Sequence, residues 1–193
     1  MSAPLVLAST SPQRRAILEQ LRIPFAVVAP TYVEDDPPGL TFTPAELVRA
    51  HAEGKARSAH AEGQLTLGVD TAVVLDGRVY GKPADRAEAE QMLHELSGRV
   101  HSVVSGVCLL GAGQHVGGHE VTEVTFRLLS HDAVDVYVES GEWEGRAGAY
   151  AIQGLGGRLV ERIEGDYLNV VGLPGALLVS LFERHAPNLL QTA

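Results

Sequence analysis

Apolar positions recur along the chain with two different spacings, and the alternation between them predicts an α/β protein. Short runs of β-branched and aliphatic residues have the length of strands, whereas other stretches repeat apolar residues every three or four positions, as amphipathic helices do. Helical stretches alternate with tight hairpins, so the sheet is expected to be mixed. The expected strands are residues 5–8, 25–29, 65–70, 71–75, 79–80, 99–110, 114–128 and 158–163, and the expected helices are residues 12–21, 44–62, 86–97, 131–139 and 174–185.

One helix has a clear start signal, and the absence of a linker favours a single domain. Thr43 and Glu46 have the spacing of a capping box, with Pro44 at the first helical position. Neither an internal repeat nor a low-complexity segment interrupts the pattern. Residues 1–193 are therefore expected to form one domain.

The segment from Gly68 to Pro83 contains the first candidates for chemistry. It is interpreted as a strand that ends at Asp70, a second strand, a tight hairpin turn and a corner, Gly81-Lys82-Pro83. The chain has thirteen arginines but only two lysines, Lys55 and Lys82. Lysine offers a compact point charge where arginine offers a planar fork, so both lysines are candidates for a site. On composition alone, chance is an equally good explanation.

A second candidate site lies where the first strand meets the first helix. Ser9-Thr10-Ser11-Pro12 supplies hydroxyls, an N-cap at Ser11 and a proline at the first helical position. The first amides of a helix have no intrahelical acceptor and the helix dipole favours negative charge there, so this turn is suited to an anion. Arg14 adds a positive charge. A solvated charged turn explains the same residues equally well.

Composition and charge then narrow the class of protein. The 45% hydrophobic and 20% charged residues are typical of a globular protein. The formal charge of −9 argues against nucleic acid as a partner. No apolar run approaches the roughly 18 residues of a membrane span, so no membrane partner is expected. The single cysteine, Cys108, is expected to be a core thiol, and together with an N-terminus unlike a signal peptide it predicts a cytoplasmic protein.

The residues alone favour phosphate chemistry. The sequence contains no Ser/His/Asp nucleophile signature, Cys-x-x-Cys pair, His-Glu-x-x-His zinc helix or standard glycine-rich nucleotide motif. An acid, two lysines, a helix N-terminus and a glycine-rich stretch over residues 141–157 remain. These features suit metal-assisted cleavage of a phosphoanhydride, with carboxylates on a hard divalent cation and basic side chains on phosphate oxygens.

Several stretches, spread over nearly the whole chain, match one known family in the same order. They are Ala8-Ser9-Thr10-Ser11-Pro12-Gln13-Arg14-Arg15, Glu34, Lys55, Gly68-Val69-Asp70-Thr71, Gly81-Lys82-Pro83, Leu96-Ser97-Gly98, Thr125-Phe126-Arg127, Ala147-Gly148-Ala149-Tyr150-Ala151-Ile152-Gln153-Gly154 and Gly165-Asp166-Tyr167-Leu168-Asn169-Val170-Val171-Gly172-Leu173-Pro174. Together they resemble the Maf family of nucleoside triphosphate pyrophosphatases. Any one stretch is a weak match, but the ordered set is specific, and both lysines fall on lysine positions of the family.

The resemblance implies an elongated α/β fold, with a mixed central sheet flanked by helices and a cleft between two lobes. It implies hydrolysis of a nucleoside triphosphate between its α and β phosphates, with Mg²⁺ or Mn²⁺ as the cofactor and a homodimer as the expected assembly. Asp70 is then the expected proton acceptor or water activator, with Glu34 as a second carboxylate at the metal. The expected catalytic residues are Asp70, Lys82 and Lys55, and the expected substrate-binding residues are Ser9, Ser11, Gln13, Arg14, Thr71 and Gln153.

The matching stretches indicate the nucleotide preference less directly, because the chain departs from both main branches of the family. The branch that resembles dTTP/UTP pyrophosphatases has arginine at the position of Gln13, together with Thr71 and Gln153. The branch that prefers 7-methyl-GTP has tryptophan at the first position and a glutamate near the last. Gln153 offers a donor and an acceptor to a pyrimidine edge, whereas a methylated guanine is positively charged and favours a carboxylate or aromatic partner. We therefore expect dTTP and UTP as substrates, with tolerance for modified pyrimidines, and keep 7-methyl-GTP as the alternative.

Two further alternatives stay open. A nucleotide-binding regulator without turnover would suit the family's association with septum formation, although the complete set of acid and lysines argues against an inactive site. A hydrolase for purine triphosphates such as ITP would suit the related architecture.

Overall fold

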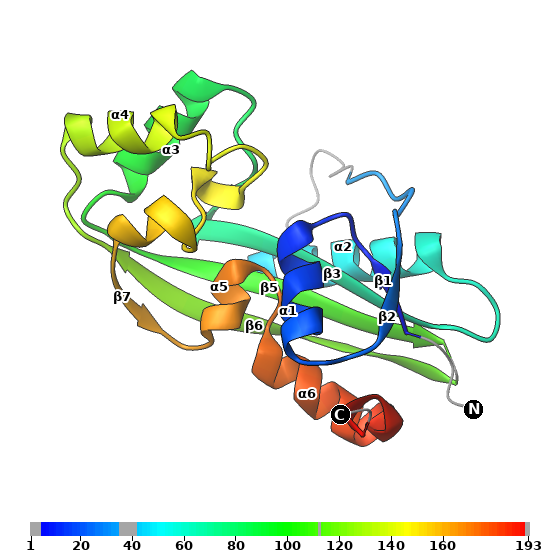
Figure 1. Cartoon of the computed structure of the whole chain (residues 1–193). Coiled ribbons are helices and arrows are strands. Elements are labelled where there is room, and N and C mark those ends of the chain that lie inside the picture. Colours follow the sequence, from blue (N-terminus) through cyan, green and yellow to red (C-terminus); the bar gives the residue numbers. More distant parts are fainter. Residues whose placement is uncertain (1–4, 35–41, 112, 192–193) are drawn as a thin grey trace.

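The structure, a computed structural model, describes residues 5–34, 42–111 and 113–191, and its strands form one mixed sheet (Figure 1). The strands are β1 (Leu5–Ala8), β2 (Phe25–Val28), β3 (Leu65–Leu75), β4 (Arg78–Tyr80), β5 (Val100–Gly111), β6 (Gln114–Phe126) and β7 (Val160–Glu164). They lie in the order β2-β1-β3-β5-β6-β7, and β4 pairs with β3 beside this path. β1 is parallel to both of its neighbours, whereas the other pairs are antiparallel. The expected mixed sheet is confirmed.

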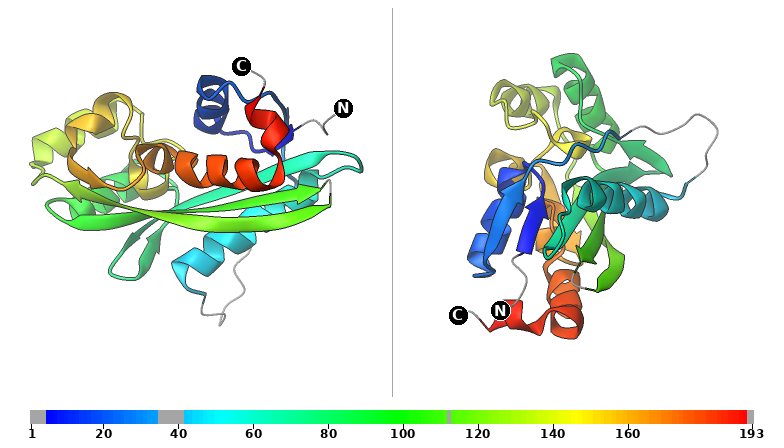
Figure 2. Two further views of the ribbon diagram at one scale, coloured as in Figure 1. Left: turned by 90° about the horizontal axis from the view of Figure 1, so that it is seen from below. Right: turned by 90° about the vertical axis from the view of Figure 1, so that its right-hand side faces the viewer.

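Helices flank the sheet on both faces, with α2 on one face and α1 and α6 on the other (Figure 2). The helices are α1 (Pro12–Gln20), α2 (Pro44–Ala59), α3 (Arg86–Leu96), α4 (His131–Glu139), α5 (Tyr167–Val171) and α6 (Gly175–His185), with 3-10 helices η1 (Ala147–Ala149), η2 (Gly154–Arg158) and η3 (Pro187–Leu190). The expected start signals are confirmed, because Ser11 caps α1 and Thr43 forms a reciprocal capping box with Glu46 at α2.

Two hydrophobic cores form the interiors of the two lobes. The α1/α6 core joins these two helices to β1 and the first half of β3, and the α3/α4 core joins α3 and α4 to the second half of β3. Typical fully buried members are Leu7, Leu18, Leu67 and Phe182 in the first core, and Leu93, Phe126 and Val134 in the second. Burying each large aliphatic side chain contributes roughly 1.5–3 kcal/mol. The long strands β3 and β5 run through both lobes and join them.

Strand β3 positions the central candidate residues. One of its edges pairs with β5 from Leu65 to Val74, while the other edge pairs with β1 only as far as Gly68 and with β4 only from Val73. The four residues 69–72 therefore have a strand on one side only, among the strands that the structure describes. We call this interval the β3 gap.

The prediction of two strands that meet after Asp70 was wrong. β3 is continuous, and Asp70 lies in its middle instead of at a strand end. The sequence shows the strand propensity of each half, but it does not show that β5 pairs along both halves and keeps the backbone extended.

Two glycines let α2 pack unusually close to the sheet. A Cβ atom on Gly68 would lie 2.0 Å from the carbonyl oxygen of Ala52, and one on Gly106 would lie 2.3 Å from that of Val48. Side chains alternate between the two faces of a strand, so Asp70, two residues after Gly68, points to the same face as α2. The close packing thus brings the acid of β3 against the helix that carries Lys55.

Other expectations differ from the structure in detail. α2 ends at Ala59 instead of Glu62, and the glycine-rich stretch contains the short helices η1 and η2. α5 was not expected, because five residues are too few to show a helical period. Cys108 is buried as expected, and burial raises the pKa of its thiol to about 11. In the described residues, no helix is long and apolar enough to cross a membrane.

Candidate active site

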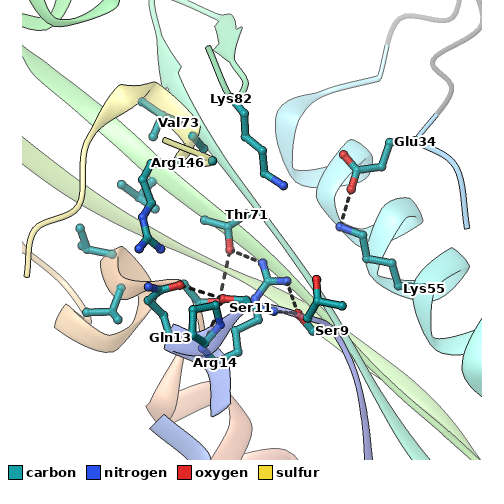
Figure 3. A pocket seen from close by; sticks show the side chains of 18 of the residues that line it. Ser9, Ser11, Gln13, Arg14, Glu34, Lys55, Thr71, Val73, Lys82 and Arg146 are labelled. Carbon is teal, nitrogen blue, oxygen red and sulfur yellow. Dashed lines mark hydrogen bonds and ion pairs between the residues drawn. The ribbon is translucent and has the colours of Figure 1, made fainter. Parts of the chain in front are cut away.

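A pocket of about 490 Å³ lies beside the β3 gap, between the two lobes (Figure 3). One side is formed by the turn from β1 into α1 and by Glu34 and Lys55, and the other by Lys82 and the segment that leads into η1. The expected cleft is confirmed. Of the expected site residues, those that line it are Ser9, Ser11, Gln13, Arg14, Glu34, Lys55, Thr71 and Lys82.

Lys55 joins the two expected carboxylates. Its Nζ lies 2.5 Å from Asp70 Oδ1 and 2.6 Å from Glu34 Oε1. Lys55 and Asp70 are buried, with relative exposures of 9% and 8%, whereas the Glu34 side chain is about half exposed at 49%. Desolvation raises the pKa of Glu34, but the hydrogen bond and charge of Lys55 outweigh it, with smaller help from His51 and Lys82, so the net pKa is lowered. Glu34 therefore stays ionised in the neutral range.

Arg14 replaces the strand that is missing at the β3 gap. Its Nη1 donates to the carbonyl oxygen of Val69 at 2.9 Å, a group that β1 no longer reaches. Its Nε donates to the carbonyl oxygen of Gly172 at 2.9 Å, and Nη2 donates to Thr71 Oγ1 at 3.2 Å. Burial lowers the pKa of Arg14, an effect that the charges of Asp70 and Glu34 only partly offset. Most of its donors are thus used within the protein, a structural role that sequence reasoning did not anticipate.

Asp70 and Thr71 follow each other in β3 and point to opposite faces of the sheet. Asp70 contacts Lys55 of α2, whereas Thr71 contacts Arg14 of α1 and lies 2.9 Å from Ser105 Oγ. Thr71 lines the pocket directly, and Asp70 adjoins it through Lys55. Because the structure describes no strand paired to this edge of β3 at residues 69–72, a single pocket can approach groups from both faces of the strand.

The turn before α1 is organised by its own hydroxyls. The backbone N–H of Ser11 donates to Ser9 Oγ at 3.2 Å, and that of Arg14 donates to Ser11 Oγ at 3.4 Å. Ser11 Oγ donates in turn to Gln13 Oε1 at 3.1 Å. Ser9 is buried, and Gln13 lines the pocket with its amide nitrogen unbonded to the residues that the structure describes. The start of α1 therefore faces the pocket, as an anion site requires.

The opposite side of the pocket is formed by a corner and a loop that support each other. The backbone N–H of Gly148 donates to the carbonyl oxygen of Gly81 at 3.0 Å, which ties the loop before η1 to the corner that carries Lys82. Gly148 has a φ of 66°, which favours glycine. Lys82 is exposed, and the side chains of Lys82 and Arg146 make no hydrogen bond or ion pair with another residue in the described ranges. We call Lys82 and Arg146 the outer wall of the pocket.

Arg146 was missed by sequence reasoning, and Gln153 lies elsewhere. Arg146 precedes the matching stretch that starts at Ala147, so its place next to that stretch was the only available signal. Gln153 occupies the N-cap position of η2 without a side-chain capping hydrogen bond, is exposed and is not among the residues that line the pocket. The structure therefore brings together the other expected substrate-binding residues without Gln153.

Glu34 and Asp70 form a donor set that fits a divalent cation shared with a substrate. No group of three or more His, Cys, Asp or Glu side chains in the described part of the chain could hold a metal ion by itself. Mg²⁺, however, is commonly bound by one or two carboxylates together with substrate phosphates. Lys55 already draws these two carboxylates to a common point, so the residues present fit such an ion.

The fold and the pocket define a class of protein. A mixed α/β fold with a cation-rich pocket beside the carboxylates Glu34 and Asp70 is typical of enzymes that act on phosphorylated substrates. The chain belongs to the Maf family, since the family model described as Maf-like protein matches residues 4–185. The resemblance seen in the sequence is thereby confirmed.

Curated relatives cover nearly all of this chain. A protein of Symbiobacterium thermophilum named dTTP/UTP pyrophosphatase is 50% identical over 172 residues, covering 88% of each chain. A protein of Pelotomaculum thermopropionicum with the same name is 44% identical over 190 residues, covering 96% of this chain and 98% of the relative. Among solved structures, a HAM1 protein from Coxiella burnetii matches with a TM-score of 0.42 and 23% identity, over 64% of this chain and 73% of the other.

Proposed function

We propose that this protein hydrolyses dTTP and UTP to the nucleoside monophosphate and pyrophosphate, with Mg²⁺ or Mn²⁺ as the cofactor. The observation that carries the proposal is the Lys55 bridge between Asp70 and Glu34 at the edge of a cation-rich pocket. Relatives that are 44–50% identical over most of the chain have the name of this activity.

The triphosphate is expected to bind between the start of α1 and Lys82. The first amides of α1 and the hydroxyl of Ser9 can donate to phosphate oxygens, and the hydroxyl of Ser11 can do so by exchanging its bond to Gln13 Oε1 for one to the ligand. Lys82 supplies a positive charge from the outer wall. Lys55 approaches from α2. These donors are suited to stabilise the negative charge that grows on the leaving pyrophosphate.

Asp70 is the group expected to accept a proton from the attacking water. Lys55 donates to Oδ1, which leaves Oδ2 of Asp70 without a hydrogen-bond partner in the described part of the chain. A buried carboxylate that is held by one oxygen keeps its orientation while the other oxygen accepts a proton. Glu34 and Asp70 would hold the divalent cation, which supplies Lewis-acid polarisation of the phosphate oxygens when bound.

The experiment is a pyrophosphate-release assay with a panel of nucleoside triphosphates. We expect dTTP and UTP to have the highest kcat/KM, activity to require Mg²⁺ or Mn²⁺, and EDTA to abolish it. A preference for 7-methyl-GTP or ITP would contradict the pyrimidine assignment. Nucleotide binding without release of pyrophosphate would instead identify a regulator.

Assembly, location and domain extent are part of the proposal and need separate measurements. The homodimer can be checked by light scattering, and the cytoplasmic location by cell fractionation. Limited proteolysis of residues 1–193 would show whether the chain behaves as one domain.

A further inference from the structure

We propose that Arg146 recognises the pyrimidine base, by donating a hydrogen bond from its guanidinium group to the O4 carbonyl of uracil or thymine. The inference deepens the proposed function and rests on it. It assigns a specificity role to a residue of the outer wall, at the opposite end of the pocket from the Lys55 bridge.

The pocket has two chemically different ends. The Lys55 end contains the hydroxyls, carboxylates and lysines described above. The other end is lined mainly by side chains that belong to the α3/α4 core or pack against it, namely Val73, Val103, Ala147, Tyr150, Val170 and Val171, and its polar lining residues are Gln13, Glu144 and Arg146. An apolar surface of this kind suits the faces of a planar base and does not suit a phosphate.

Arg146 lies at the apolar end. Figure 3 shows its side chain beside Val73, with Thr71 between it and the Glu34–Lys55 pair. The segment that carries Arg146 packs directly on this surface, because a Cβ atom on Gly148 would lie only 2.8 Å from the Val73 side chain. The backbone of Arg146 is held by two hydrogen bonds. Its N–H donates to the carbonyl oxygen of Trp143, and its carbonyl oxygen accepts from the N–H of Ala149. The guanidinium group is therefore held where the base, and not the polyphosphate, is expected.

The donors of Arg146 are free for a ligand. Its Nε is buried and has no hydrogen-bond partner among the described residues. Arg14, on the facing side, instead spends its Nε, Nη1 and Nη2 on Gly172, Val69 and Thr71. A buried donor without a partner is unfavourable, and an acceptor on the ligand would remove that cost.

The chemistry of the base determines which ligand fits. A guanidinium group can only donate hydrogen bonds. Uracil and thymine present the O4 acceptor, whereas cytosine has an amino group at the same position that also donates. Two donors that face each other leave both unpaired, so Arg146 should favour UTP over CTP and dTTP over dCTP.

The test compares UTP with CTP in wild-type protein, Arg146→Met, Arg146→Gln and the control Arg184→Met. Arg184 is an exposed arginine on α6 that does not line the pocket, so its loss controls for the removal of one positive charge. Because glutamine can donate to O4 or accept from the cytosine amino group, Arg146→Gln should process the two nucleotides at similar rates. Thermal melting of each variant reports folding.

We expect the ratio of kcat/KM for UTP to that for CTP to fall by about tenfold or more in both Arg146 variants and to stay unchanged in Arg184→Met. An equal loss with UTP and CTP would overturn the inference and identify Arg146 as a phosphate contact. If Arg146→Met fails to fold, the Arg146→Gln ratio decides alone. Wild-type protein that releases no pyrophosphate from UTP or dTTP would overturn the proposed function itself, which is a separate result.

Discussion

The two sides of the pocket hold their charges in different ways. On the inner wall, by which we mean Ser9, Arg14, Lys55, Asp70 and Thr71, each charged group is bonded to other groups of the protein. On the outer wall, Lys82 and Arg146 make no such bonds in the described part of the chain. Substitutions of the charged groups in the inner wall should therefore reduce both activity and stability. Substitutions in the outer wall should reduce activity alone.

The cause of the difference lies in the elements that form each wall. The inner wall belongs to β3, α1, α2 and the turn between β1 and α1. These elements are packed in the α1/α6 core or held against the sheet at Gly68. The outer wall belongs to the corner after β4 and the loop before η1, which are joined by one backbone hydrogen bond between Gly148 and Gly81. Connections of this kind leave side chains free for a ligand.

The largest effect is expected from Asp70→Asn, which removes the chemistry of the inner wall and keeps its shape. The amide cannot accept the proton, so pyrophosphate release from UTP should fall by about 10³-fold or more. Steady-state assays measure the loss, and circular dichroism should show an unchanged fold. Activity close to that of the wild type would contradict the assignment of Asp70.

Lys55→Met tests whether the inner wall contributes both to the stability of the fold and to activity. Asp70 loses its cation in a buried position, so the free energy of unfolding should fall by about 3 kcal/mol, and activity should be lost as well. Urea denaturation monitored by circular dichroism measures the first effect. A stable but inactive Lys55→Met protein would show that the inner wall is not part of the stability of the fold.

The stability of the region around Tyr150, in the segment that follows Arg146, should depend on pH through His101. Its Nε2 lies 2.9 Å from the hydroxyl of Tyr150, and burial lowers its pKa to about 4. In the unfolded chain the imidazole takes up a proton near pH 6.5, but in the folded protein it does so only near pH 4. As the pH falls through this window, the contribution of His101 to stability should decrease by about 3 kcal/mol.

The measurement is the free energy of unfolding of wild-type protein and His101→Phe between pH 7 and pH 4. The phenylalanine fits among Phe126 and Tyr150 but does not titrate, so the wild type should lose more stability than the variant. Parallel curves for the two proteins would contradict the prediction.

The smallest effect is expected from Lys82→Met, which removes a charge of the outer wall. Activity with UTP should fall by about 10²-fold, because a phosphate loses its cation. The melting temperature should stay within the error of the wild-type value, since Lys82 is exposed and makes no ion pair in the described ranges. Comparison with Lys55→Met tests the contrast between the walls directly, with the same substitution on each side.

Local signals in the sequence predicted much of this molecule. The hydroxyl cap at Ser11 and the capping box at Thr43 depend on residues close in sequence, and both are confirmed. The order of the expected helices and hairpins is also confirmed, apart from the continuous β3 and the unexpected α5. The matching stretches also included most of the residues that line the pocket.

The features that escaped prediction depend on contacts between distant segments. Arg14 bonds to Val69 and Gly172, which are 55 and 158 residues away in the chain. The central position of Asp70 in β3 depends on pairing with β5. Arg146 is brought to the pocket by a loop whose shape follows from the Gly148–Gly81 bond. None of these contacts leaves a periodic pattern in the sequence.

The β3 gap also has a consequence for strand register. Asp70 and Thr71 serve one pocket from opposite faces of the same strand, so a slip of β3 by one residue would exchange the acid and the hydroxyl between α2 and Arg14. Pairing with β5 from Leu65 to Val74 prevents that slip. The long hairpin partner, although it contributes few groups to the pocket, therefore works as a register lock for its chemistry.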